Sequence, residues 1–111
     1  MSGDVAADEL LRQIEAGRAP FILDVRSRAE FDAGHVPGSV NLPFWAIPFR
    51  ASSLSAKPDE PIVVYCGHGP RAHLAMAALR ARGFTRVTCL SGHWAGWRSA
   101  RYPEQTEADD F

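Results

Sequence analysis

The sequence predicts an α/β domain in which helices cover both faces of a mostly parallel central sheet. Three short apolar runs, at residues 21–25, 62–65 and 87–90, have the length and continuity of strands that are buried on both faces. Segments with helical spacing alternate with these runs, which is the order of elements that builds a parallel sheet. The 111 residues are enough for one hydrophobic core and too few for two.

The N-terminal segment predicts a helix followed by the first strand. An extended piece around Val5 precedes four apolar residues at helical spacing: Ala7, Leu10, Leu11 and Ile14. Gly17 is expected to end this helix, because glycine readily adopts the left-handed conformation that closes many helices. The run at residues 21–25 is apolar apart from Asp24, and it predicts a buried strand.

The middle of the chain predicts short elements. Ser27 and Glu30 have the S-x-x-E spacing of a capping box, which opens a short helix that ends at Gly34. A turn at residues 35–38 and a brief strand at residues 40–42 follow. Pro43 and Pro48 predict a short, irregular helix at residues 44–50. The polar segment at residues 52–61, which contains Pro58 and Pro61, is expected to be a connection.

The C-terminal half predicts a strand, a helix, a strand and a helix. After the strand at residues 62–65, a helix from about residue 71 to residue 82 has one apolar face: Ala72, Ala75, Met76 and Leu79. Gly83 is expected to close this helix, with Phe84 packing back on Leu79. The run at residues 87–90 predicts another buried strand, and residues 92–99 predict a short helix that carries Trp94 and Trp97.

The domain is expected to span residues 1–101, followed by a tail at residues 102–111. This tail contains four acidic residues and few apolar ones. Such a segment buries too little apolar surface to be held firmly, so we expect it to be mobile.

Charge and composition exclude several classes of function. The formal net charge is −1, which gives no reason to expect a nucleic acid or an anionic membrane as partner. No apolar run is long enough for a signal peptide or a membrane span, so a cytoplasmic location is expected. Two cysteines, Cys66 and Cys89, do not make a disulfide framework; we expect free thiols, with a bridge between them as the minor alternative.

Residues 65–71 (YCGHGPR) are the most informative segment of the chain. Cys66 stands where a strand ends, two glycines and a proline follow, and Arg71 opens a helical pattern. Such a loop can turn several backbone N–H groups inward beside a helix N-terminus, which lowers the pKa of a thiol and holds an anion beside the sulfur. Arg71 adds positive charge at the rim. The segment therefore predicts a nucleophilic cysteine in an anion-binding loop.

Three motifs extend this prediction to most of the chain. They are residues 23–26 (LDVR) with 30–31 (EF) and 34–43 (GHVPGSVNLP); residues 64–66 (VYC) with the loop to Arg71; and residues 83–84 (GF), Val87 and 90–97 (LSGHWAGW). Together they resemble the N-terminal, active-site and C-terminal signatures of the rhodanese family of sulfurtransferases, in its single-domain form. The resemblance runs from about Val5 to Trp97. One position departs from it, because His93 stands where the family usually has a second glycine.

The resemblance implies a rhodanese-like three-layer fold and a sulfurtransferase. Cys66 would attack the outer sulfur of thiosulfate or a related small anionic donor, release sulfite and carry the sulfur as a persulfide. The acceptor would be cyanide or a thiol, including a protein thiol, and no metal or organic cofactor is implied. The resemblance assigns substrate binding to the rest of the loop: Gly67, His68, Gly69, Pro70, Arg71 and Ala72.

Two other functions remain open. Phosphatases of this fold have five residues between cysteine and arginine, whereas four residues separate Cys66 from Arg71; the shorter loop favours sulfur over phosphate or arsenate. A sulfur-relay or protein-binding module without efficient small-molecule turnover is the main alternative. Thiosulfate is favoured over 3-mercaptopyruvate because Arg71 and the titratable His68 make the loop basic.

Other polar residues have plainer interpretations. Cys89 is expected to be a core residue, although a resolving role beside Cys66 stays open. His68 is expected in the loop, His73 on a solvated helix face, and His35 and His93 in turns. Three charged residues near the first strand predict buried or half-buried ion pairs that fix the loops beside the site: Asp24, Arg26 and Glu30.

Overall fold

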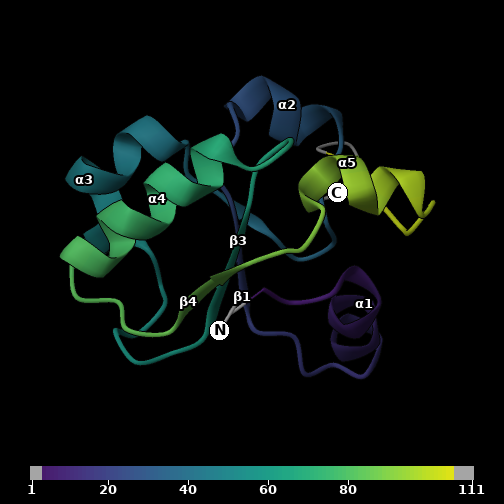
Figure 1. The fold of residues 1–111 in the computed structure, drawn as a ribbon, viewed down its shortest axis with the longest axis horizontal. Helices are drawn as coiled ribbons and strands as arrows, with labels where there is room; N and C mark the ends of the chain where they lie inside the picture. The colour runs from purple at the N-terminus through teal and green to yellow at the C-terminus, as the bar shows by residue number, and fades with distance from the viewer. Residues whose placement is uncertain (1–3, 107–111) are drawn as a thin grey trace.

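A computed structural model describes residues 4–106, which form a four-stranded parallel sheet with strand order β2-β1-β3-β4 (Figure 1). The strands are β1 (Phe21–Asp24), β2 (Val40–Asn41), β3 (Ile62–Tyr65) and β4 (Val87–Cys89). A single parallel bridge joins Val5 to Leu90, just beyond β4. The predicted parallel sheet is confirmed, and β3 occupies one of its two inner positions.

Helices cover both faces of this sheet. They are α1 (Ala7–Glu15), α2 (Arg28–Ala33), α3 (Ile47–Arg50), α4 (Pro70–Ala81) and α5 (His93–Ser99). In Figure 1, α3 and α4 lie to the left of the strands, whereas α1 and α5 lie to the right. Among the described residues, no helix is long and apolar enough to cross a membrane. The predicted three-layer α/β architecture is therefore confirmed.

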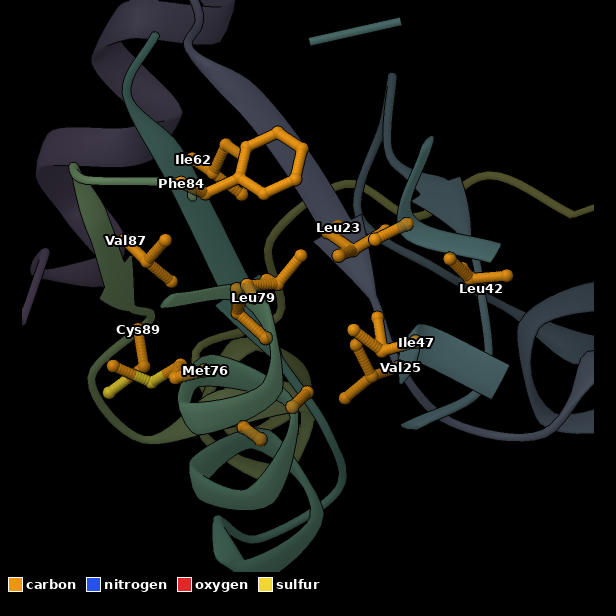
Figure 2. Close-up of a cluster of buried hydrophobic side chains, with 14 of the residues drawn as sticks. Leu23, Val25, Leu42, Ile47, Ile62, Met76, Leu79, Phe84, Val87 and Cys89 are labelled. Carbon is orange, nitrogen blue, oxygen red and sulfur yellow. The ribbon is translucent and has the colours of Figure 1, made fainter. Parts of the chain in front are cut away.

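Alternating strand residues build the two halves of the core. Leu23, Ile62 and Val64 point to the face covered by α3 and α4, and Figure 2 shows Met76 and Leu79 of α4 packed against this face. Ile22 and Val63 point the other way, toward α1 and α5. Because side chains alternate along a strand, one buried strand can support both layers.

The predicted ends of two helices are confirmed. The Ser27 hydroxyl accepts a hydrogen bond from the Glu30 N–H at 3.2 Å, and the Glu30 carboxylate accepts one from the Ser27 N–H at 3.0 Å, which completes the capping box of α2. After α4, Gly83 has φ +99° and the Phe84 N–H donates to the Leu79 carbonyl at 3.1 Å. This bond is the one expected of a Schellman ending.

The irregular segment after β2 departs slightly from its predicted form. A 3-10 turn (Phe44–Ala46) leads into the single turn of α3, and a second 3-10 turn (Ala51–Ser53) extends into the segment that the sequence predicts as a connection. Pro48 occupies the second position of α3, where a missing N–H costs no hydrogen bond inside the helix. A proline there is compatible with a helix of only one turn.

The first part of the predicted tail contacts the domain. Gln105 forms an antiparallel bridge with His35, whose backbone groups exchange hydrogen bonds with it at 2.8 and 2.9 Å. The Trp97 indole N–H donates to the Pro103 carbonyl at 2.7 Å. Hydrogen bonds to the main chain of Pro103 and Gln105 therefore hold the first part of the tail, which the acidic composition does not reveal. The rest of the predicted tail, residues 107–111, lies outside the described residues.

The core position of Leu79 gives a direct test of the packing. Leu79 is fully buried on α4, whereas Leu74 on the same helix is 60% exposed. We expect Leu79→Ala to lower the free energy of unfolding by about 2–5 kcal/mol, since it leaves a cavity between α4 and the sheet. Leu74→Ala is the matched control and should cost less than about 0.5 kcal/mol. Urea unfolding of both variants checks this, and equal losses would contradict the assigned face of α4.

Candidate active site

The loop that carries Cys66 lies at the carboxyl end of an inner strand. Cys66 is the first residue after β3, and α4 begins four residues later at Pro70. Its side chain is only 1% exposed. In parallel α/β sheets this edge is where ligands bind, so the structure puts the predicted nucleophile at the expected end of the sheet.

Backbone N–H groups converge on the sulfur of Cys66. The Gly69 N–H donates to Sγ at 3.0 Å, and Gly69 has φ +136°, in a region that only glycine occupies without strain. Burial raises the pKa of Cys66. Hydrogen bonds from the His93 side chain and from the backbone N–H groups of Ala72, Gly69 and His68 lower it. The outcome is a pKa of about 7, below the ordinary value of a thiol. A substantial thiolate fraction is therefore present near neutral pH.

The first turn of α5 also binds the backbone of the loop. The Trp94 N–H donates to the Cys66 carbonyl at 2.9 Å, and the Ala95 N–H donates to the Gly67 carbonyl at 3.1 Å. These two hydrogen bonds fix the backbone of the loop at Cys66 and Gly67 against α5. The loop N–H groups that stabilise Sγ come from Ala72, Gly69 and His68, and they suit a sulfur that carries negative charge.

Arg71 lies at the rim of the loop, but its charge is matched. Its guanidinium donates to both carboxylate oxygens of Glu30, at 2.7 and 3.2 Å. These hydrogen bonds, opposed by a smaller effect of burial, lower the pKa of Glu30 to about 2. The same guanidinium packs closely on Gly67, where an added Cβ would lie 3.1 Å from Nη2. Arg71 therefore links α4 to α2 beside the loop through its ion pair with Glu30, and its role toward a substrate stays a prediction.

A buried ion pair lies where the end of β1 meets α2 and α5. Arg26 donates to Asp24 at 2.7 Å and to the Gly34 carbonyl at 2.6 Å, and neither charged side chain is more than 3% exposed. The Arg26 guanidinium also lies over the Trp94 ring, 4.8 Å from its centroid. This pair joins the end of β1 to α2 and α5, which confirms the predicted structural role of these charges.

One residue of the site is absent from the sequence prediction: His93. It is 7% exposed, and its Nδ1 accepts a hydrogen bond from the Cys66 N–H at 3.3 Å. The sequence predicts that His93 lies in a turn, and its departure from the family glycine is the only signal at this position. That signal does not show that His93, as the first residue of α5, faces Cys66.

The other predicted site residues differ in their surroundings. His68 and Pro70 are exposed, whereas Gly67, Gly69 and Ala72 are buried. The roles of these residues toward a substrate stay predictions. Among residues 4–106, no three His, Cys, Asp or Glu side chains gather in a way that could hold a metal ion.

Cys89 differs from Cys66 in its electrostatics. Both cysteines are free thiols, and Cys89 is buried in the core beside α4. Its thiol donates to Asp4 Oδ1 at 2.9 Å; burial, and then this acidic neighbour, raise the pKa of Cys89 to about 12. Cys89 therefore stays protonated near neutral pH and is a much weaker nucleophile than Cys66.

A hollow lies at the other end of the sheet. Its volume is about 690 Å³, and its lining includes Pro20, Pro61 and Val87 at the amino ends of three strands. Cys66 does not border it. The chemistry of the loop, and not the size of a cavity, identifies the candidate site.

The reactivity of the two thiols should differ sharply with pH. We expect the rate at which iodoacetamide alkylates Cys66 to rise through a midpoint near pH 7, since the thiolate is the reactive form. Cys89 should remain unmodified over the same range. Peptide mass spectrometry of quenched samples distinguishes the two sites. A midpoint for Cys66 at or above the ordinary value of about 8.5 would contradict the described geometry.

The ion pair between Glu30 and Arg71 should make stability depend on pH in the acid range. The folded-state pKa of Glu30 is depressed to about 2 from 4.5, so its contribution is present above pH 4.5 and is lost as the pH falls toward 2. Glu30→Gln keeps a capping side chain, and because the pair is partly exposed it should cost only about 0.5–1 kcal/mol at pH 7.

Urea titrations at several pH values measure this difference, with the exposed Asp59→Asn as control. The gap between the wild type and Glu30→Gln should close in strong acid. A gap that stays constant from pH 7 to strong acid would show that the carboxylate charge is not what stabilises the pair.

Comparisons with known proteins agree with this geometry. The profile of the Rhodanese-like domain matches residues 6–100. The chain is 30% identical over 97 residues to a sulfurtransferase of Allochromatium vinosum, covering 87% of this chain and 89% of that protein. It is 36% identical over 85 residues to the thiosulfate sulfurtransferase GlpE of Pseudomonas savastanoi pv. phaseolicola, covering 77% of each.

A solved structure shows the same fold. The crystal structure of the Alr3790 protein from Anabaena sp. superposes with a TM-score of 0.82 at 33% identity, covering 92% of this chain and 91% of that one. The family resemblance carried by the three sequence motifs is thereby confirmed. With a matching profile over most of its length and sulfurtransferases among its relatives, the chain belongs to the rhodanese-like domain family.

Proposed function

We propose that this protein moves a sulfane sulfur from thiosulfate, or a related small anionic donor, to a thiol or to cyanide through a persulfide on Cys66. The observation that carries the proposal is the Gly69 N–H, which donates to Sγ at 3.0 Å, at a thiol whose pKa is lowered to about 7 by His93 and the loop N–H groups. Relatives named sulfurtransferases support it.

The first step loads the sulfur. The Cys66 thiolate attacks the outer sulfur of thiosulfate, a new S–S bond forms, and the S–S bond of thiosulfate breaks with its electron pair leaving on sulfite. Cys66 then carries an anionic persulfide. The loop N–H groups that stabilise the thiolate are suited to hold this charge too, because they are fixed before the reaction begins.

The second step unloads it. Cyanide or a thiolate attacks the outer sulfur, the persulfide S–S bond breaks, and its electron pair returns to Cys66 as the thiolate. Thiocyanate or an acceptor persulfide leaves. No oxidant, reductant or cofactor enters either step.

The electrostatics of the loop favour sulfur over phosphate as its guest. The donors to Sγ come from His68, Gly69 and Ala72, and Pro70 between them has no N–H. A persulfide is a smaller guest with one diffuse negative charge, which a few N–H groups can stabilise.

Intact mass spectrometry tests the proposal. After incubation with thiosulfate and removal of excess reagent, the wild type should gain the mass of one sulfur atom, and cyanide should remove it. Cys66→Ser should gain nothing, whereas Cys89→Ser is the matched control and should behave as the wild type does. A wild type that gains no sulfur but hydrolyses an aryl phosphate would overturn the proposal. Sulfur loading without measurable turnover of cyanide would favour the relay module over the enzyme.

A further inference from the structure

We propose that His93 is a positioning residue for Cys66: its imidazole holds the backbone of the nucleophile and donates a hydrogen bond to the sulfur. This inference rests on the proposed chemistry at Cys66. It goes further in naming a side chain, contributed by α5 and not by the loop, that sets the reactivity of the thiol. The loop alone would then be an incomplete site.

The imidazole of His93 faces two parts of the loop at once. Its Nδ1 accepts the N–H of Cys66 at 3.3 Å. Its Nε2 lies beside Gly69, 3.4 Å from the point where a Cβ on that residue would stand. Gly69 is the residue whose N–H donates to Sγ at 3.0 Å. The ring therefore lies against the segment that encloses the sulfur.

The backbone hydrogen bond selects one tautomer of the ring. An N–H donor from Cys66 requires a lone pair on Nδ1, so the neutral imidazole carries its proton on Nε2. Nε2 is then the ring nitrogen that can donate, and hydrogen bonding to the His93 side chain is the leading effect that lowers the pKa of Cys66 against the opposing effect of burial. One ring thus fixes the main chain and stabilises the thiolate.

The backbone at His93 is consistent with a selected role. His93 has φ 53°, and it follows Gly92, which has φ +80°. A residue with a Cβ in this left-handed region is strained relative to glycine, and such strain is found most often at functional sites. Glycine would fit the turn more easily, but it would offer neither ring nitrogen to Cys66.

Few titratable groups surround the ring. Cys66 approaches it from the loop after β3, and His73 approaches it from α4, with the two imidazole centroids 6.4 Å apart. Arg71 and Glu30 form their ion pair between α4 and α2. His73 is exposed and is the one neighbouring imidazole among these groups, which makes it a suitable control.

Three substitutions separate the role of the ring from its bulk. His93→Phe keeps a ring without nitrogen, His93→Gly relieves the left-handed backbone, and His93→Gln restores an amide that can both accept and donate. His73→Phe is the matched control. For each protein, the pH midpoint of Cys66 alkylation and the separate kcat and KM for thiosulfate are measured, together with the melting temperature.

We expect the Cys66 midpoint to rise by about one pH unit in His93→Phe and His93→Gly, since a hydrogen bond to a charged group is lost. At pH 7 this rise lowers kcat by about five- to tenfold, with a smaller change in KM. His93→Gln should recover most of the loss, and His73→Phe should leave the midpoint and kcat unchanged. Because His93→Gly removes backbone strain, a loss of activity in a folded His93→Gly protein cannot be attributed to that strain.

A measurement on the wild type needs no variant. The ¹⁵N shifts of the His93 ring should report a protonated Nε2 and an unprotonated Nδ1, and both should change when Cys66 is alkylated. A midpoint that stays the same in both His93→Phe and His93→Gly, or a ring protonated on Nδ1 alone, would overturn the inference. The proposed function fails separately, by the absence of sulfur on the wild type after thiosulfate.

Discussion

The sulfur of Cys66 must hold negative charge in a place that water scarcely reaches. With 1% of the residue exposed, desolvation opposes the thiolate, and it is the largest single effect on the pKa of Cys66. Only groups with fixed N–H dipoles close to the sulfur can offset that penalty. The positions of the loop, the two helices that contact it and the buried ion pair beside it all follow from this constraint.

Three elements keep the N–H groups directed inward. The two glycines of the loop permit the required backbone, α5 binds the loop carbonyls through Trp94 and Ala95, and the link between Arg71 and Glu30 ties α4 to α2. The pair between Asp24 and Arg26 joins the end of β1 to α2 and α5. Because these contacts already fix the N–H groups in the resting protein, little reorganisation free energy is needed when the reaction occurs.

Much of the fold could be predicted because its signals are local. Apolar runs gave the inner strands, the S-x-x-E pattern gave the start of α2, and Gly83 gave the end of α4. Cys66 and its loop could be predicted for the same reason, since strand, glycines and helix start are consecutive. The acidic composition of the tail was a poor guide to its first residues, because Gln105 is held through backbone groups that every sequence has.

The contacts that complete the site are not local. Glu30 and Arg71 are 41 residues apart, and Cys66 and His93 are 27 residues apart. Residue types alone identified Arg71 as a cation at the rim, but not the carboxylate that matches its charge. His93 was visible only as a departure from a glycine, and its meaning depends on how α5 begins against the loop.

The central claim is that the loop holds a sulfur-bound anion on Cys66. A crystal structure of the protein after exposure to thiosulfate tests this claim most directly. The account predicts one additional sulfur atom bonded to Cys66 Sγ and surrounded by the N–H groups of His68, Gly69 and Ala72. Unmodified Cys66, or added sulfur on Cys89 instead, would contradict it.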